Sequence, residues 1–87
     1  MNVTVYTTTT CPYCKMLKEY FNQNSVPFIE KLVDQDDQAR QQMMLDSGGF
    51  LGVPFTTIEK EGLPKETVVG FDKARLDTIL GINNDIH

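Results

Sequence analysis

The segment Cys11-Pro12-Tyr13-Cys14 constrains the fold of this chain more than any other, because it contains both cysteines and separates two segments of different periodicity. Before it, residues 3–6 form a β-branched run that is typical of a short strand. After it, apolar residues recur at helical spacing. The two thiols are therefore expected where a strand has just ended and a helix begins.

This placement favours redox chemistry. Cysteines three positions apart on a first helical turn lie on nearly the same face, so their sulfurs can join without a large backbone movement. At Cys11, unpaired N–H groups and the positive end of the helix dipole favour a thiolate and lower the pKa of the thiol. Pro12 suits the first helical position because it has no N–H to leave unpaired. We expect Cys11 to attack a disulfide and Cys14 to resolve it.

Length and charge limit the function classes. A chain of 87 residues with 40% hydrophobic content suits one domain, residues 1–87. A net charge of −4 and a pI of about 4.7 argue against a nucleic-acid surface. The sequence shows no apolar run long enough to cross a bilayer and no secretion signal at its start. We expect a cytoplasmic monomer without membrane partners.

One close cysteine pair in a reducing compartment indicates either a catalytic pair or a metal site. A structural zinc site needs about four ligands. Beyond the two thiols the chain offers only one histidine, His87, at its last position. We therefore favour the redox role and expect no metal site.

The remaining sequence continues to alternate strands and helices. After the first helix, we expect a strand over residues 28–33, a helix from an Asp36 cap to Gly48-Gly49, strands over residues 55–59 and 66–69, and a helix from an Asp72 cap to Gly81. The inward residues are expected to be Tyr13, Met16, Leu17, Tyr20 and Phe21 in the first helix, Ala39, Met43 and also Met44 in the second, and Leu76, Ile79 and Leu80 in the third.

The resulting order is strand, helix, strand, helix, strand, strand, helix. The helical crossover makes the first two strands parallel, and the short link makes the last two antiparallel. The expected fold class is α/β, with a four-stranded mixed sheet flanked by three helices. Over essentially its whole length the chain resembles the thioredoxin fold and, within it, the glutaredoxin family. Besides the element order, the features that carry this resemblance are Cys11-Pro12-Tyr13-Cys14, Val53-Pro54 and Gly70-Phe71-Asp72.

The resemblance implies a dithiol oxidoreductase and roles for residues beyond the cysteines. Pro54, which by sequence alone is a strand-starting proline, would follow a cis peptide bond, and Val53 would pair through its backbone with an extended thiol substrate. Pro12 and Tyr13 would border the substrate cleft, with Tyr13 shielding the disulfide.

Glutathione is the co-substrate that the resemblance implies. Its γ-glutamyl end would bind at Gly70, Phe71 and Asp72, a segment that also suits a turn and a helix cap. The chain departs from the family pattern in having Val69 in place of a glycine, Lys73 in place of an acid, and Thr8 in place of a basic residue. Two charge partners of so ionic a ligand are therefore missing.

These departures leave a second reading open. Glutaredoxin-like redoxins that donate electrons to ribonucleotide reductase are recharged by thioredoxin reductase, and they need an apolar docking surface. Phe50, Leu51, Val53 and Phe71 would supply it, unless they pack in the core. Some glutaredoxins also share a metal cluster between two chains, a role that Pro12 disfavours.

Two further alternatives concern the surroundings of the cysteines. The pair could form a structural disulfide in a binding module, which resistance to reduction would reveal. Lys15 and Lys18 either add positive potential near Cys11 or are solvated surface charges.

Overall fold

The computed structural model describes residues 1–49 and 52–81. Its elements alternate as the sequence predicts, and they are β1 (Asn2–Thr7), α1 (Pro12–Gln23), β2 (Ile29–Leu32), α2 (Asp37–Ser47), β3 (Phe55–Glu59), β4 (Glu66–Val69) and α3 (Lys73–Leu80). The last two strands begin and end at the predicted residues, whereas β1 is longer and β2 shorter than predicted. The expected element order is confirmed.

The four strands form one mixed sheet in the order β2-β1-β3-β4. β1 is parallel to β2 and antiparallel to β3, and β3 is antiparallel to β4. The parallel strands β1 and β2 are connected through α1, whereas the antiparallel strands β3 and β4 are connected by a short loop. This arrangement confirms the expected α/β fold.

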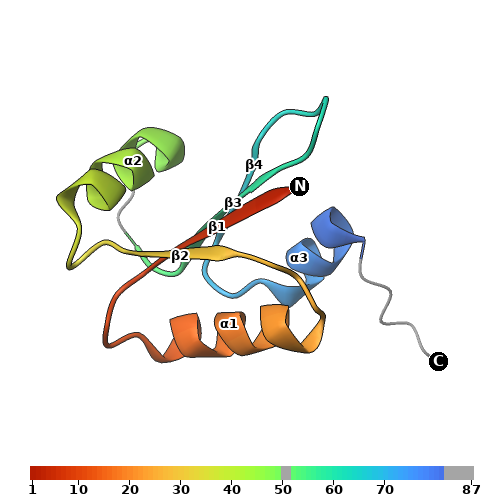
Figure 1. Cartoon of the computed structure of the whole chain (residues 1–87), viewed down its shortest axis with the longest axis horizontal. Coiled ribbons are helices and arrows are strands. Elements are labelled where there is room, and N and C mark those ends of the chain that lie inside the picture. The colour runs from red at the N-terminus through yellow and green to blue at the C-terminus, as the bar shows by residue number, and fades with distance from the viewer. Residues whose placement is uncertain (50–51, 82–87) are drawn as a thin grey trace.

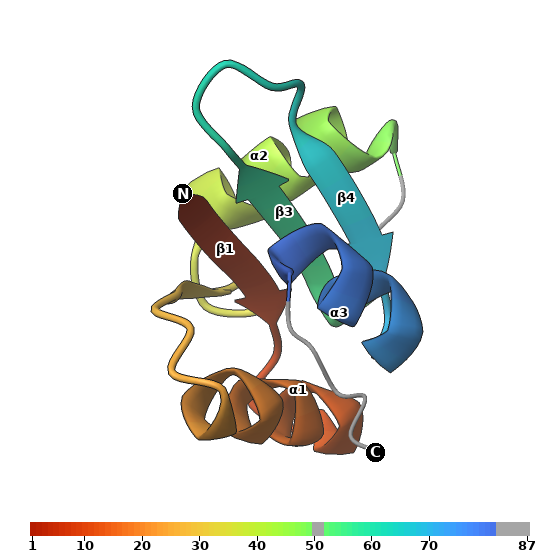
Figure 2. The same cartoon turned by 90° about the vertical axis from the view of Figure 1, so that its right-hand side faces the viewer.

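The helices cover both faces of the sheet. α1 and α3 lie on one face and α2 lies on the other (Figures 1 and 2). Since side chains alternate along a strand, Val5 packs with α1 and α3 whereas Tyr6 packs with α2. The buried core on the first face consists of Val3, Val5, Leu17, Tyr20, Phe21, Ile58, Val68, Leu76 and Ile79, and that on the second face of Tyr6, Ala39, Met43 and Phe55.

The predicted helix caps are present. The Asp36 carboxylate accepts hydrogen bonds from the N–H groups of Gln38 and Ala39, at 3.0 and 3.3 Å. The Asp72 carboxylate accepts one from Arg75 N–H at 3.2 Å. α2 ends at Gly48, whose φ of 74° is a left-handed conformation that glycine adopts without steric cost.

The predicted inward face of α1 is partly wrong. Tyr13 and Met16 are 63% and 47% exposed, and Cys14 is buried instead. Successive helical residues are rotated by about 100°, so a stripe that turns Cys14 toward the sheet leaves Tyr13 facing outward. In α2, Met43 is buried as predicted, whereas Met44 is 40% exposed. The buried residues of α1 are Cys14, Leu17, Tyr20 and Phe21.

Candidate functional site

The two cysteines stand at the junction between β1 and α1, as the sequence predicts. Cys11 is the N-cap of α1, with extended backbone angles, and Pro12 occupies the first turn. The sulfurs of Cys11 and Cys14 form a disulfide. The Cys14 N–H also donates a hydrogen bond to Cys11 Sγ at 3.2 Å. The attacking position in our hypothesis is thus held by a backbone donor of the helix N-terminus.

The two sulfurs differ in access to solvent. Cys14 is only 1% exposed, whereas Cys11 is half-buried. Cys11 is therefore the more accessible residue of the pair. Cys14 is the more protected of the two residues, although it contributes to the lining of the pocket described below.

The strand register brings the other predicted site residues to the same end of the sheet. Tyr6 pairs with Phe55, which pairs with Val69 on its other side. The segments that adjoin these three positions, namely residues 7–11, 53–54 and 70–72, consequently lie at one sheet edge. The sequence motifs, although distant along the chain, are therefore neighbours in the fold.

The Val53–Pro54 peptide bond is cis, as the resemblance implied. Pro54 is buried, and its carbonyl accepts a hydrogen bond from Gly70 N–H at 2.8 Å. The N–H and C=O of Val53 make no hydrogen bond with another residue that the structure describes. The Val53 backbone thus has no partner in the described part of the chain, while Gly70 helps to fix the proline beside it.

Phe71 and Asp72 connect this edge to α1 and α3. Phe71 is half-buried and meets Tyr20 edge-on, with ring centroids 5.7 Å apart. The Tyr20 hydroxyl donates to the Asp77 carboxylate, which also binds Lys73 Nζ at 2.9 Å. Burial, followed by the hydrogen bond to Asp77, raises the pKa of Tyr20 above its usual range. Lys73, which departs from the family pattern, therefore forms an ion pair within α3.

The two residues of the proposed apolar surface that can be placed are half-buried, and each packs against the edge of a core cluster. Val53 packs against the α2 face and Phe71 against the face covered by α1 and α3. Phe50, Leu51 and His87 lie outside the described residues.

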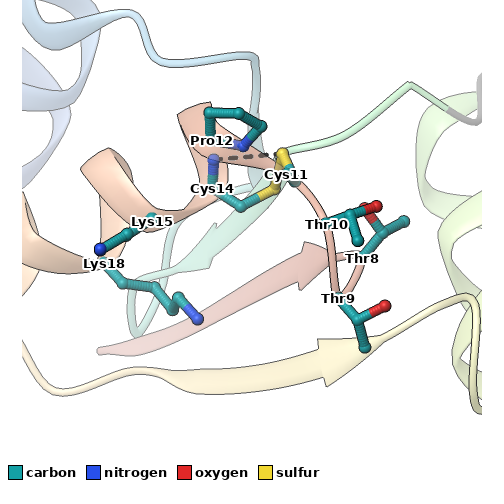
Figure 3. A pocket seen from close by; sticks show the side chains of 8 residues that line it. All are labelled: Thr8, Thr9, Thr10, Cys11, Pro12, Cys14, Lys15 and Lys18. Carbon is teal, nitrogen blue, oxygen red and sulfur yellow. Dashed lines mark hydrogen bonds between the residues drawn. A yellow bond between two sulfur atoms is a disulfide. The ribbon is translucent and has the colours of Figure 1, made fainter.

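A pocket of about 650 Å³ opens beside the disulfide (Figure 3). Two lysines of α1 lie on one side of it and three threonines of the preceding loop on the other. Among the described residues, its lining contains neither Val53 nor the segment 70–72. The lining residues are Thr8, Thr9, Thr10, Cys11, Pro12, Cys14, Lys15 and Lys18.

A partly exposed polar network lies beside this pocket. Glu30 of β2 accepts hydrogen bonds from Lys18 Nζ at 2.8 Å and from Thr7 Oγ1 at 2.7 Å. The bond from Lys18, followed by that from Thr7, lowers the pKa of Glu30. No pattern in the sequence indicates Glu30 or Thr7, because only the parallel pairing of β1 and β2 brings them together. A threonine run directly before a cysteine was the one signal for the pocket.

The described residues contain neither a candidate metal site nor a candidate membrane-spanning helix. In that part of the chain no group of three or more His, Cys, Asp and Glu side chains is placed to hold a metal ion. No helix there has the length and apolar character needed to span a membrane.

Comparison with known proteins places this geometry in a family. Residues 3–62 match the glutaredoxin family. An uncharacterized glutaredoxin-like 8.6 kDa protein of Clostridium pasteurianum is 33% identical, over 90% of this chain and 96% of that protein. A probable glutaredoxin of Synechocystis sp. is 36% identical, over 90% of this chain and 73% of that protein.

Solved structures agree with the sequence comparison. A mutant of the thioredoxin-like protein BC3987 has a TM-score of 0.80 and 29% identity, over 94% of this chain and 97% of that one. The glutaredoxin-like NrdH-redoxin of Escherichia coli, at 23% identity, shares the fold with a TM-score of 0.68, over 99% of this chain and 100% of that one. The chain therefore belongs to the glutaredoxin family, as a glutaredoxin-like redox protein with a Cys-x-x-Cys pair at Cys11 and Cys14.

Proposed function

We propose that this protein is a dithiol oxidoreductase that reduces disulfides of proteins or of glutathione through Cys11 and Cys14. The observation that carries the proposal is the asymmetry of the pair: Cys11 is accessible and accepts a backbone N–H, whereas Cys14 is buried one helical turn inward. A donor to sulfur favours the thiolate, which is the nucleophile in disulfide exchange.

The reaction follows from this geometry. In the reduced protein, the Cys11 thiolate attacks one sulfur of a substrate disulfide, forming a mixed disulfide, and the other substrate sulfur leaves as a thiolate that takes up a proton. Cys14 loses its proton and attacks Cys11 Sγ. The second substrate thiol is then released and the Cys11–Cys14 disulfide forms. Two electrons pass from the protein to the substrate.

The substrate chain is proposed to lie along Val53. The N–H and C=O of Val53, which have no partner among the described residues, support pairing with an extended peptide, since an added strand gains its affinity from main-chain hydrogen bonds. The hydrogen bond from Gly70 N–H to the Pro54 carbonyl helps to hold the adjoining backbone in place.

Two substitutions test the proposed cysteine roles. Cys11→Ser should abolish reduction of a small disulfide, because the remaining thiol is buried. Cys14→Ser should instead accumulate a mixed disulfide with the substrate, which mass spectrometry detects as the added mass. Full activity of Cys11→Ser, or attachment of the substrate at Cys14, would refute the assignment.

Recharging of the oxidised protein needs an external dithiol or thiol reductant, and glutathione is our first candidate. It would bind beside Gly70, Phe71 and Asp72, where Gly70 and the cap of α3 face the end of the sheet that carries the cysteines. A thioredoxin reductase is the second candidate. Two departures from the family pattern favour it. Thr8 stands in place of a basic residue, and Lys73, which stands in place of an acid, is paired with Asp77.

One experiment separates the two donors. Turnover of a common disulfide is measured with NADPH and either glutathione plus glutathione reductase or thioredoxin reductase alone. Fast cycling with glutathione supports the first candidate, and fast cycling only with thioredoxin reductase replaces it by the second. Absence of cycling with either, together with a disulfide that resists dithiothreitol, would indicate a structural disulfide instead.

A further inference from the structure

We infer that the pocket formed by Thr8, Thr9, Thr10, Lys15 and Lys18, hereafter the threonine-lysine pocket, is a specificity subsite for a carboxylate side chain of the protein substrate next to the disulfide under attack. This inference rests on the proposed function. It concerns the flank of Cys11 that faces β2 (Figure 3). Val53, the proposed backbone contact, precedes β3, which lies on the other side of β1 in the sheet.

The charge of the lining differs from that of the whole chain. The protein has a net charge of −4, yet the pocket is lined by two lysines and no acid. Lys18 is held by Glu30, but Lys15 forms no ion pair with another described residue. An exposed lysine on a flexible stem reaches several positions. Of the two lysines that line the pocket, Lys15 is therefore the one that has no acidic partner among the described residues.

The hydroxyl groups add unpaired donors. Thr8 and Thr10 make no side-chain hydrogen bond with other described residues, whereas Thr9 donates to Asp34 through both its N–H and its hydroxyl, at 3.1 and 2.8 Å. Those bonds from Thr9 lower the pKa of Asp34. Asp34 is not among the residues that line the pocket. The pocket thus has an ammonium on one side and two hydroxyls on the other, and each is a donor that a carboxylate can accept from.

The position of the pocket next to Cys11 indicates which carboxylate of the substrate would bind there. Cys11 itself lines the pocket, so an anion bound there lies within a residue or so of the substrate sulfur. A substrate chain that pairs with Val53 on one flank would direct the neighbouring side chain across Cys11 to the other. A substrate with Asp or Glu next to its cysteine can pair with the Val53 backbone and also place its carboxylate in the pocket. A Lys at the same position is repelled by the positive charge of Lys15.

The test uses reduced protein in a single turnover, so that the identity of the electron donor does not matter. Three cyclic disulfide peptides, identical except for Glu, Gln or Lys beside the cysteine that is attacked, are mixed with the protein, and the reaction is quenched by acid. The second-order rate constant should be about three- to five-fold higher for Glu than for Gln, and lowest for Lys, with the differences shrinking at high salt.

Variants then locate the effect. In Lys15→Gln the ratio of the Glu to the Gln rate constant should fall to about one, and in Lys15→Glu the preference should reverse toward the Lys peptide. Lys60→Gln, which removes the same charge from the β3–β4 connection, should keep the preference. A ratio near one in the parent protein, or an unchanged ratio in Lys15→Gln, would overturn the inference while leaving the proposed function intact.

Two other outcomes are equally decisive. If the parent protein reduces none of the peptides, the proposed function fails and this inference falls with it. If Lys15→Gln slows reduction of glutathione disulfide while the peptide preference persists, the pocket binds a carboxylate of glutathione and the protein-substrate assignment is wrong.

Discussion

At the scale of single residues, what distinguishes the two thiols is access rather than sequence position. Both cysteines belong to one helical turn, yet Cys14 is 1% exposed and Cys11 is half-buried. Cys14 faces the sheet because it shares the stripe of Leu17 and Phe21. The same rotation exposes Tyr13, which we had expected to be inward. The three positions between the cysteines thereby leave Cys11 accessible and Cys14 buried.

Thr56 provides a prediction at this scale. Its side chain is fully buried in β3, and its hydroxyl has no hydrogen-bond partner among the described residues. An unsatisfied buried hydroxyl costs free energy, whereas a methyl group in its place does not. Thr56→Val should therefore raise the free energy of unfolding by about 1 kcal/mol, as measured by urea denaturation.

Thr7 is the matched control, because it is equally buried but donates to Glu30. Thr7→Val should lower the free energy of unfolding. If both substitutions lower the free energy of unfolding equally, the buried hydroxyl of Thr56 does not destabilise the folded protein, and the prediction is wrong.

At the scale of elements, a few polar contacts fix how helices and strands meet. Glu30 joins β2 to α1 through Lys18 and to β1 through Thr7. On the other face, Asp46 of α2 accepts hydrogen bonds from Tyr6 and Lys65, at 3.4 and 3.0 Å. Burial first, and Asp46 second, raises the pKa of Tyr6 to about 12. These contacts orient elements that the apolar core alone would hold less specifically.

The Glu30 network should appear in the acid dependence of stability. Because the pKa of Glu30 is lowered in the folded protein, its contribution is present above the ordinary value of 4.5 and is lost as the pH falls through the folded value. Glu30→Gln should lower the free energy of unfolding at pH 7 by about 0.2 to 1 kcal/mol, since the pair is partly exposed.

Urea denaturation at successive pH values tests this expectation. The difference between the parent protein and Glu30→Gln should narrow below pH 4.5. Glu19→Gln, on the exposed side of α1, is the control for the loss of a surface carboxylate outside this network. A constant difference across this range would contradict the role given to the carboxylate.

The cap of α2 supplies a second prediction for elements. α2 buries only Ala39 and Met43, so packing contributes little to its start, and Asp36 satisfies two of its first N–H groups. Asp36→Ala should cost about 0.5 to 2 kcal/mol in the free energy of unfolding and speed hydrogen exchange in the first turn of α2. Asp36→Asn keeps an acceptor and should lose much less. Equal losses in both variants would mean that charge, not capping, is what matters.

At the scale of the whole molecule, stability depends on a small core divided between two faces of one sheet. A domain of this size is stabilised by only about 5 to 15 kcal/mol. Leu17, at 0% exposure, packs in the larger cluster, and Leu17→Ala should cost about 2 to 5 kcal/mol. The fall in urea midpoint measures this loss.

Leu45 is the control for the same chemical change, because it is 77% exposed. Leu45→Ala should shift the free energy of unfolding by less than about 0.5 kcal/mol. Similar losses in the two variants would show that α2 packs more tightly than its exposure indicates.

Local sequence determined the elements of this protein and the identity of its redox pair. Helix caps at Asp36 and Asp72, β-branched runs and the Cys-Pro-Tyr-Cys segment act within a few residues, so their outcome could be predicted without knowledge of the rest of the chain. The antiparallel pair β3–β4 was predicted to the residue for the same reason. The cis bond before Pro54 was reached only through resemblance to the glutaredoxin family.

Only the tertiary structure decided which side chains surround the sulfur. The rotation of α1, the contact of Glu30 with Lys18 and Thr7, the packing of Val53 and Phe71, and the pocket beside Cys11 all depend on how separate elements pack. Such contacts join residues distant along the chain, and their geometry is set by the sheet register and by the burial of whole faces. Neither is encoded at any one position of the sequence.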